Sequence, residues 1–384
     1  MDPRDFQAPN AGRVIKTPTG YHAFVPAPLP PPLEFDAPLV LALSRADTAL
    51  SELSGLGRLL PNPHLLIAPY MRREAVLSSR IEGTQATLEQ VLIDEAQADL
   101  PGGEPADLRE VRNYIRALEH SIARLDKLPL SLRLIREAHA QLMRGVRGDR
   151  ATPGEFRRSQ NWIGPQGSTP ETAVFVPPPP VEMLECLDAW ERHAQERDRL
   201  PDLVHCALLH AQFETIHPFL DGNGRIGRLL VTLFMVERGR LSQPLLYLSA
   251  YIDEHKRDYY ELLQRTRTHG DWRAWIMYFL DGVTTTARDA VARAGRLNDL
   301  REKTRRKLGK DGNALALLDA LLENPFVTAG RAAKLLDVSN PTARKAIRAL
   351  EGAGLLREVS RRRWGQVYKA EPVMRILRAD APKD

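Results

Sequence analysis

The chain of 384 residues contains few cysteines and no long hydrophobic run. Its two cysteines, Cys186 and Cys206, lack the CxxC spacing of metal and redox sites, which favours two buried thiols in a reducing compartment. The longest apolar runs, such as Leu229–Val236, are too short to span a membrane. The first residues, MDPRDFQAPNAGR, contain no basic stretch followed by an apolar one, so we expect no secretory signal. These absences predict a cytoplasmic protein without a membrane partner.

Positive charge is concentrated towards the C-terminus. The formal net charge is +5, but residues 285–384 hold 22 Lys and Arg against 12 Asp and Glu, whereas the rest of the chain holds 32 against 37. A basic C-terminal quarter on an acidic body indicates a separate module with an anionic partner. A basic surface kept for solubility would give the same composition, so charge alone does not decide.

The periodicity of apolar residues predicts a mainly α-helical protein of two or three domains. Turn-rich residues 155–180 predict one short β-hairpin, and five prolines between Pro26 and Pro32 predict an extended arm. Helices are expected at about 63–80, 85–98, 105–125, 130–144, 180–195, 201–214, 225–238, 254–268 and 271–307. The expected divisions are a Pro-rich arm (1–36), an N-terminal helical region (37–125), a core (126–284), a charged helical connector (285–311) and a C-terminal domain (312–375).

The segment from His217 to Arg228, HPFLDGNGRIGR, combines one His, one carboxylate, three glycines and two arginines. Glycines let backbone N–H groups approach an anion, a helix N-terminus favours negative charge, and arginines bind phosphate oxygens in pairs. An acid can hold a divalent cation against phosphates, and a His can move a proton at neutral pH. The segment therefore predicts a phosphate site with a base beside it.

Two folds could carry these glycines. Gly222, Gly224 and Gly227 satisfy GxGxxG, but a dinucleotide site needs a preceding strand, and LVHCALLHAQFETI repeats its apolar residues at helical spacing. A helix, tight loop and second helix is therefore expected instead. Arg225 and Arg228 then share one face near the N-terminus of the second helix, where the helix dipole disfavours cations unless a polyphosphate is bound.

The segment resembles the signature of the Fic family, HPFx(D/E)GNGRxxR, at every specified position. The resemblance extends to NYIRALEH near Asn113, to PGEFRRSQNWIG at 153–164, to the FVPPPP that ends the hairpin, and to LYLSAYIDEHKRDYYELLQ at 246–264. It covers roughly residues 35–285. It implies a Fic-type helical core with a small β-hairpin flap, with the catalytic core in residues 126–284.

The resemblance also implies an activity, namely Mg²⁺-dependent transfer of AMP from ATP to a Tyr, Thr or Ser hydroxyl of a target protein, or of the chain itself. The implied roles are a catalytic base at His217, Mg²⁺ binding at Asp221, an anion hole at Gly222, Asn223 and Gly224, β-phosphate binding by Arg225 and γ-phosphate binding by Arg228, with Gly227 completing the ATP site. The flap, about 172–176, would pair with the target, with Phe175 as a clamp over the nucleotide. Tyr259 and Tyr260 would lie near adenine or ribose, although ordinary core aromatics fit these three positions equally well.

An upstream motif points to inhibition. The residues Ser78-Ser79-Arg80-Ile81-Glu82-Gly83 resemble the family's inhibitory motif, (S/T)xxxE(G/N), although an exposed Glu beside a Gly is also common in ordinary helices. The resemblance implies that Glu82 pairs with Arg228 and occupies the place of the γ-phosphate. ATP would then bind with its α-phosphorus out of line.

The C-terminal domain resembles a winged helix-turn-helix. Thr328 is expected to cap the helix 329–336, and the helix that follows Ser339 turns Thr342, Arg344, Lys345 and Arg348 outward, which suits recognition of DNA in a major groove. The basic residues 361–363, with Arg362 at their centre, would form a wing tip that touches phosphates. A winged helix used for protein contacts or dimerisation is the alternative.

The sequence thus predicts a cytoplasmic protein adenylyltransferase with an N-terminal inhibitory motif, ATP and Mg²⁺ as ligands, and a homodimer as a possible state. Three alternatives stay open. The chain could be a DNA-binding regulator that uses ATP only as a ligand. It could use another donor, such as a different nucleotide or a phosphocholine carrier, or it could remove AMP at the same site.

Overall fold

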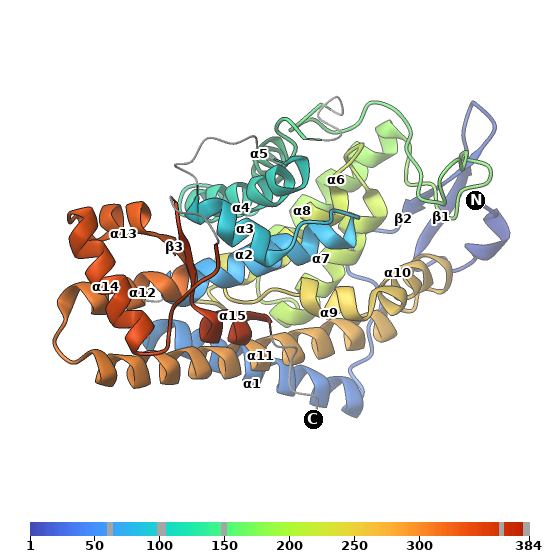
Figure 1. Cartoon of the computed structure of the whole chain (residues 1–384). Coiled ribbons are helices and arrows are strands. Elements are labelled where there is room, and N and C mark those ends of the chain that lie inside the picture. The colour runs from blue at the N-terminus through green and yellow to red at the C-terminus, as the bar shows by residue number, and fades with distance from the viewer. Residues whose placement is uncertain (60–63, 98–104, 147–151, 361–364, 379–384) are drawn as a thin grey trace.

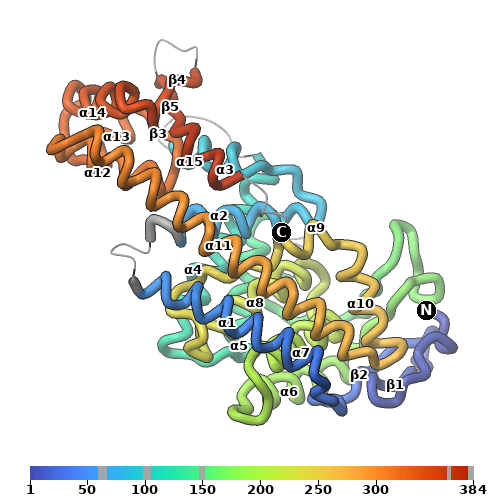
Figure 2. Tube along the Cα trace, turned by 90° about the horizontal axis from the view of Figure 1, so that it is seen from below, coloured from blue at the N-terminus to red at the C-terminus, as the bar shows by residue number. Residues whose placement is uncertain are grey.

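A computed structural model describes residues 1–59, 64–97, 105–146, 152–360 and 365–378 (Figure 1). The fold is mainly helical. No helix within these ranges is both long and apolar enough to cross a membrane. A small N-terminal sheet lies at one end of the molecule and the C-terminal domain lies at the other (Figures 1 and 2).

The centre of the body is α7 (Asp202–Ile216), in which every residue from Leu203 to Ile216 is buried. Helices α6, α8, α10 and α11 pack against it. A helix surrounded in this way needs no solvent-facing polar side, so its polar residues, such as His210 and Glu214, are buried as well. The other helices of the body are α2 (His64–Ile81), α3 (Leu88–Ala96), α4 (Ala106–Leu125), α5 (Leu132–Leu142), α6 (Pro180–Gln195), α8 (Asn223–Glu237), α9 (Ser249–Glu254) and α10 (Lys256–His269).

The expected helices are confirmed to within about three residues at each end, with one addition. Helix α9 was not expected, and it is separated from α10 at His255. Helix α8 begins two residues earlier than the sequence predicted, at Asn223, which places Gly224 inside its first turn.

Helices α1 (Ala37–Leu59) and α11 (Trp272–Leu308) run side by side along the molecule (Figure 2). Helix α11 is continuous for 37 residues and crosses the expected boundary between core and connector at residues 284 and 285. Residues 285–308, most of the expected charged helical connector, are therefore the second half of a long helix that was itself expected at about 271–307.

The N-terminal region differs from the extended arm that was expected. Strands β1 (Gly12–Lys16) and β2 (His22–Pro26) form an antiparallel pair, with Val14 opposite Phe24. The prediction of an extended arm relied on the proline cluster. That cluster begins only at Pro26, the last residue of the hairpin, and so gives no information on residues 12–25. The expected hairpin within residues 155–180 is reduced to a single bridge between Ile163 and Phe175. The Phe24 N–H donates to the carbonyl oxygen of Val176 at 2.9 Å, so this segment instead joins β2.

The C-terminal domain has the order helix, strand, helix, helix, strand, strand, helix. Its elements are α12 (Gly312–Glu323), β3 (Phe326–Thr328), α13 (Ala329–Leu336), α14 (Asn340–Gly352), β4 (Arg357–Glu358), β5 (Val367–Lys369) and α15 (Glu371–Arg378). The three strands are antiparallel in the order β3-β5-β4. The domain packs on α2, α3 and α11 of the body.

Candidate active site

His217 ends α7 in a left-handed conformation, with φ 50° and ψ 60°, which is uncommon for a residue other than glycine. The buried Arg157 holds this turn, because its Nε donates to the His217 carbonyl oxygen at 3.0 Å and its Nη2 to that of Pro178 at 2.5 Å. The amide of Asn161 donates to the carbonyl oxygens of His217 (3.3 Å) and Phe219 (2.9 Å). Side chains from residues 155–180 therefore fix the orientation of His217.

The loop after His217 is held from two further directions. The Asn223 side chain accepts from the Phe219 N–H and donates to the Phe219 carbonyl oxygen, both at 2.8 Å. The ring of His139 stacks on Phe219 with centroids 3.7 Å apart, and its Nε2 lies 3.0 Å from the carbonyl oxygen of Asp221. The loop is thus preorganised without a ligand.

The start of α8 leaves backbone donors available. Gly222 has a φ of 81°, and the first helical bond runs from the Ile226 N–H to the Gly222 carbonyl oxygen. The N–H groups of residues 223–225 therefore lie outside the helical ladder, as they do at any helix N-terminus. Such groups favour an anion, so this geometry is compatible with the expected anion hole at Gly222, Asn223 and Gly224, which stays a prediction.

Gly224 and Gly227 let two carboxylate groups approach the backbone of α8 closely. A Cβ on Gly224 would lie 2.4 Å from Oε1 of Glu82, and a Cβ on Gly227 would lie 2.2 Å from Oε1 of Glu214. Each glycine therefore lets a carboxylate lie directly against the first turns of α8.

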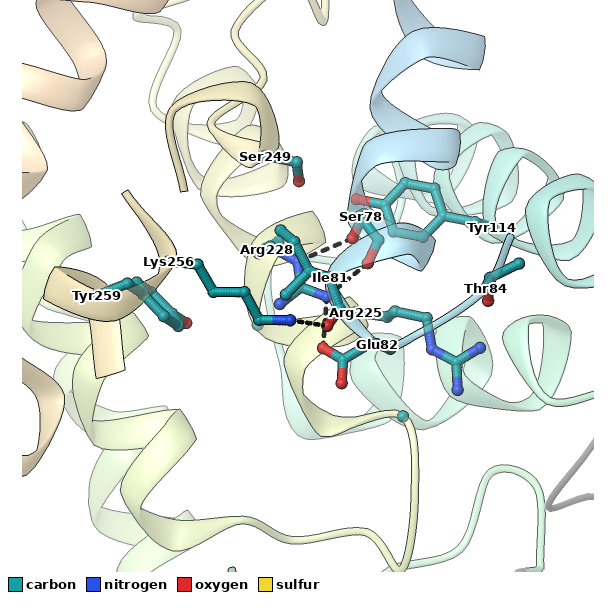
Figure 3. A network of polar contacts seen from close by, with 12 residues as sticks. Ser78, Ile81, Glu82, Thr84, Tyr114, Arg225, Arg228, Ser249, Lys256 and Tyr259 are labelled. Atoms are coloured by element: carbon teal, nitrogen blue, oxygen red, sulfur yellow. Dashed lines mark hydrogen bonds and ion pairs between the residues drawn. The ribbon is translucent and has the colours of Figure 1, made fainter. Parts of the chain in front are cut away.

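The structure brings together the residues of the upstream motif and Arg228 (Figure 3). The buried guanidinium of Arg228 donates from Nη2 to Oε1 of Glu82 at 2.6 Å, and from Nε to Oγ of Ser78 at 2.9 Å. The same Nη2 donates to the Ser78 carbonyl oxygen at 2.9 Å. Lys256 fastens the end of α2, because its Nζ donates to the Ile81 carbonyl oxygen at 2.7 Å. Glu82 is thus paired with Arg228 as the sequence predicted.

Arg225 is also buried, but it is less well satisfied than Arg228. Its Nη1 lies 3.6 Å from Oε2 of Glu110, and its Nη2 lies 3.5 Å from Oδ1 of Asp221. Among the described residues, Nε and Nη1 of Arg225 have no hydrogen-bond partner. A buried guanidinium with unused donors is well suited to accept an anion.

Asp221 is the residue at this loop that fits a metal ion. Its carboxylate is about half exposed, and one oxygen accepts the Gly222 N–H at 2.6 Å. The described residues contain no group of three or more His, Cys, Asp or Glu that could hold a metal. One carboxylate suits Mg²⁺, which is commonly bound by one or two carboxylates together with substrate phosphates and water.

The electrostatics of the site keep His217 neutral and Glu82 ionised. Burial, assisted by Arg267 and Arg157, lowers the pKa of His217 from 6.5 to about 4, so the imidazole is neutral at pH 7. Burial raises the pKa of Glu82, but the attraction of Arg228 outweighs it and leaves the pKa below its ordinary value. Burial raises the pKa of Glu214 from 4.5 to about 7.

The three aromatic residues expected at the nucleotide differ in position. Phe175 is fully buried and packs on Phe6 and Phe24, which is the position of a core residue, and its role as a clamp stays a prediction. Tyr259 is buried, and its hydroxyl lies 2.9 Å from Nε2 of His210. Tyr260 is about half exposed and is the one of the three that a nucleotide could reach directly.

Sequence reasoning did not assign Arg157, Asn161, His139, Glu214 or Lys256 to the site. Arg157 and Asn161 lie in the stretch PGEFRRSQNWIG, whose resemblance to the family's core assigns no role to its single residues. The other three carry no local pattern that marks them.

The residues expected to contact DNA lie far along the chain from this site. Arg344, Lys345 and Arg348 are exposed on α14, whereas Ala343, Ile347 and Leu350 of the same helix are buried. Arg362 lies outside the described residues.

Comparison with known proteins agrees with this geometry. Residues 40–123 match the family model described as Fic/DOC family N-terminal, and residues 129–235 match the model of the Fic/DOC family. The chain therefore carries Fic/DOC family domains. Residues 217–228 fall within the second match.

Similar curated proteins bear the name protein adenylyltransferase Fic. The protein from Drosophila grimshawi is 28% identical over 205 residues, covering 52% of this chain and 39% of the relative. The protein from Drosophila melanogaster is 27% identical over the same length, covering 52% and 38%. The chain thus matches well under half the length of these relatives.

Solved structures share the fold. A Fic family protein from Desulfovibrio desulfuricans G20 has a TM-score of 0.57 at 22% identity, covering 89% of this chain and 98% of that one. Fic-1 from C. elegans has a TM-score of 0.50 at 17% identity, covering 66% and 72%.

Proposed function

We propose that the Fic/DOC domains of this chain transfer AMP from ATP to a hydroxyl group of a protein. The observation that carries the proposal is a neutral, partly buried His217 held beside a helix N-terminus that presents two buried arginines. A base and a polyphosphate cradle within one loop are what nucleotidyl transfer requires, since such reactions depend on alignment, charge neutralisation and one proton acceptor.

Different groups of the chain would bind the phosphates, the metal ion and the adenosine. The free N–H groups at the start of α8 and the guanidinium of Arg225 bind the α- and β-phosphates, and Arg228 binds the γ-phosphate once Glu82 has left. Asp221 would hold Mg²⁺, which supplies charge neutralisation at the phosphates when bound. Tyr260 lies where it could contact the adenosine.

The proton balance fits His217. The target hydroxyl oxygen bonds to the α-phosphorus, the bond between that phosphorus and the bridging oxygen breaks, and pyrophosphate leaves. His217 accepts the hydroxyl proton, and because its Nδ1 is buried the transfer goes to Nε2.

Replacement of the base tests the activity. We expect His217→Ala to abolish incorporation of label from ATP labelled at the α-phosphate, while ATP still binds. His22→Ala, on β2, is the matched control and should label normally. The mass added to the protein identifies the transferred group, so addition of anything other than AMP would point to another donor. Transfer that survives in His217→Ala would contradict the mechanism.

We further propose that the Glu82–Arg228 pair inhibits transfer. The carboxylate takes the hydrogen-bond positions of Arg228 that a γ-phosphate would use. Glu82→Gly should therefore increase labelling at least about tenfold, within the usual range of coupling between sites. Glu52→Gly, on the exposed side of α1, is the control. Equal or lower labelling in Glu82→Gly would show that the pair does not inhibit.

Faster loss of AMP from labelled wild-type protein than from the Glu82 variant would support removal of AMP at this site.

For residues 312–375 we propose a winged helix-turn-helix domain that binds DNA. The order of its elements and the exposed cations of α14 support this. Duplex DNA should bind with an affinity that falls steeply with salt, and Arg344→Glu with Arg348→Glu should abolish binding. Lys303→Glu with Arg306→Glu on α11 makes the same charge change elsewhere and should weaken binding little. Absence of binding at low salt would favour a protein-contact role.

A further inference from the structure

Helix α3 lies between the C-terminal domain and the segment that carries Glu82 (Figure 2). The chain leaves α2 at Ile81, passes through Glu82 and Gly83, and enters α3 at Leu88. Five residues, 83–87, thus separate the inhibitory carboxylate from a helix that contacts another domain.

The contact between α3 and the C-terminal domain has its own apolar core. Leu92 and Ala96 of α3 pack with three side chains of that domain, and all five are at most 5% exposed. The three are Phe326 of β3, Val367 of β5 and Met374 of α15.

Polar contacts reinforce this interface at both ends of α3. Near its start, Glu89 pairs with Lys369 at 2.9 Å and with Arg378. The Lys369 amine is 7% exposed, so this charge depends on its partners. Further along, the amide of Asn324 donates to the Leu92 carbonyl oxygen at 3.0 Å and, near the end of α3, to Oε2 of Glu95 at 3.4 Å.

The link between α3 and Glu82 is short and well ordered. Thr87 caps α3 with a capping box shared with Gln90. Thr84 donates to Oε2 of Glu110 at 2.6 Å, and Glu110 is the carboxylate that lies 3.6 Å from Arg225. Gly83 has a φ of 100°, a backbone conformation that favours glycine. The position of α3 therefore constrains how far Glu82 can move from Arg228.

We propose that docking of the C-terminal domain on α3 holds the Glu82–Arg228 pair closed, so that loosening this interface activates transfer. The proposal rests on the proposed function and names its regulation. A ligand can act in this way only if it binds the undocked and docked states with different affinities. In both views β3 lies between α14 and α3 (Figures 1 and 2), and Arg344, Lys345 and Arg348 of α14 are exposed in this docked state.

Two variants from opposite sides of the interface test the proposal. Glu89→Lys places a cation beside Lys369 and Arg378, and Met374→Lys places one in the apolar core of the contact. Both should raise AMP labelling at least about fivefold, the lower end of typical coupling between sites. In a Glu82→Gly background neither should add a further increase, because the inhibitory contact is already absent. Glu52→Lys makes the same charge change on α1 and should leave labelling unchanged.

Two measurements decide the proposal even if no transfer is found. In both variants, amide exchange should quicken in residues 82–97, and ATP should bind at least about fivefold more tightly because Arg228 is free. Faster exchange without tighter ATP binding would overturn the proposal, because α3 would then move without releasing Glu82. Unchanged exchange would overturn it as well, since the C-terminal domain would not be what holds α3. If Glu82→Gly also fails to transfer AMP, the proposed activity is wrong. The amide-exchange and ATP-binding results would still decide whether the C-terminal domain holds Glu82 on Arg228.

Discussion

Arg157 is a buried cation that binds backbone carbonyl groups instead of a carboxylate. It sets the left-handed turn at His217 and helps to lower the pKa of that imidazole. We expect Arg157→Met to reduce kcat by about 100-fold, because small misplacements of a catalytic group are costly, with little change in ATP affinity. The pKa of His217, followed by NMR of its ring, should rise. Arg157→Lys should retain part of the rate, and a loss of ATP binding equal to the loss of rate would contradict a positioning role.

Glu214 makes a prediction about stability and pH. Its pKa is about 7 in the folded protein and 4.5 when unperturbed, so between these values the folded state holds a proton that the unfolded state has released. Ionisation of this group therefore lowers stability as pH rises through the window. Glu214→Gln should flatten the dependence of the unfolding free energy on pH between about 5 and 7, as measured by urea unfolding. Glu52→Gln should leave the dependence unchanged.

For single residues, the sequence predicted the candidate site residues that belong to a motif. It missed the residues whose side chains hold that motif in place. His217, Asp221 and Arg228 lie within twelve residues, and Glu82 was found through a second motif. Arg157 and His139 act on the backbone of the loop, and a contact between a side chain and a distant carbonyl leaves no local pattern. Phe175 shows a second limit of sequence-based prediction. The sequence pattern around an aromatic residue is the same whether its side chain faces a ligand or the hydrophobic core.

Among the helices, α3 is short and depends on its cap. The Thr87 hydroxyl accepts from the Gln90 N–H, and the Gln90 side chain accepts from the Thr87 N–H. Thr87→Ala should lower the unfolding free energy by about 1 kcal/mol, the usual value of such a cap. Thr48→Ala on α1 removes only a bond to the Ser44 carbonyl oxygen, and it should change stability by less than about 0.5 kcal/mol. Equal effects in the two variants would show that the cap contributes nothing special.

The sequence predicted elements well where apolar residues repeat at a helical period. It failed at β1 and β2, where five-residue strands adjoin a proline cluster that suggests an extended chain. It predicted α11 as one helix at about 271–307, because the change in charge along it alters only the exposed face of a helix and need not end it. Pairing between distant segments, such as β2 with residues 175–176, cannot be read from either partner alone.

In the whole molecule, the C-terminal domain is not independent of the body. One continuous cluster of buried side chains extends from Leu50 in α1 through Val283 in α11 to Leu317 and Ile347 in the C-terminal domain. We expect calorimetry to show a single unfolding transition for the wild-type chain, because the two parts share this core. In Glu89→Lys the transition should broaden or divide. Two well-separated transitions in the wild-type protein would contradict the shared core.

Gly224 lies against both Glu82 and Arg228, because a Cβ there would lie 2.4 Å from Oε1 of Glu82 and 2.9 Å from Nη1 of Arg228. Under the proposed mechanism, a substitution at Gly224 that expels Glu82 would also obstruct the nucleotide. A substitution at Glu82 removes the inhibition and leaves the chemistry intact. Mutation of Glu82 can therefore remove the inhibition while activity is kept, whereas mutation of Gly224 cannot. In evolution, descendants of this protein should become constitutively active through changes near Glu82 while position 224 stays fixed.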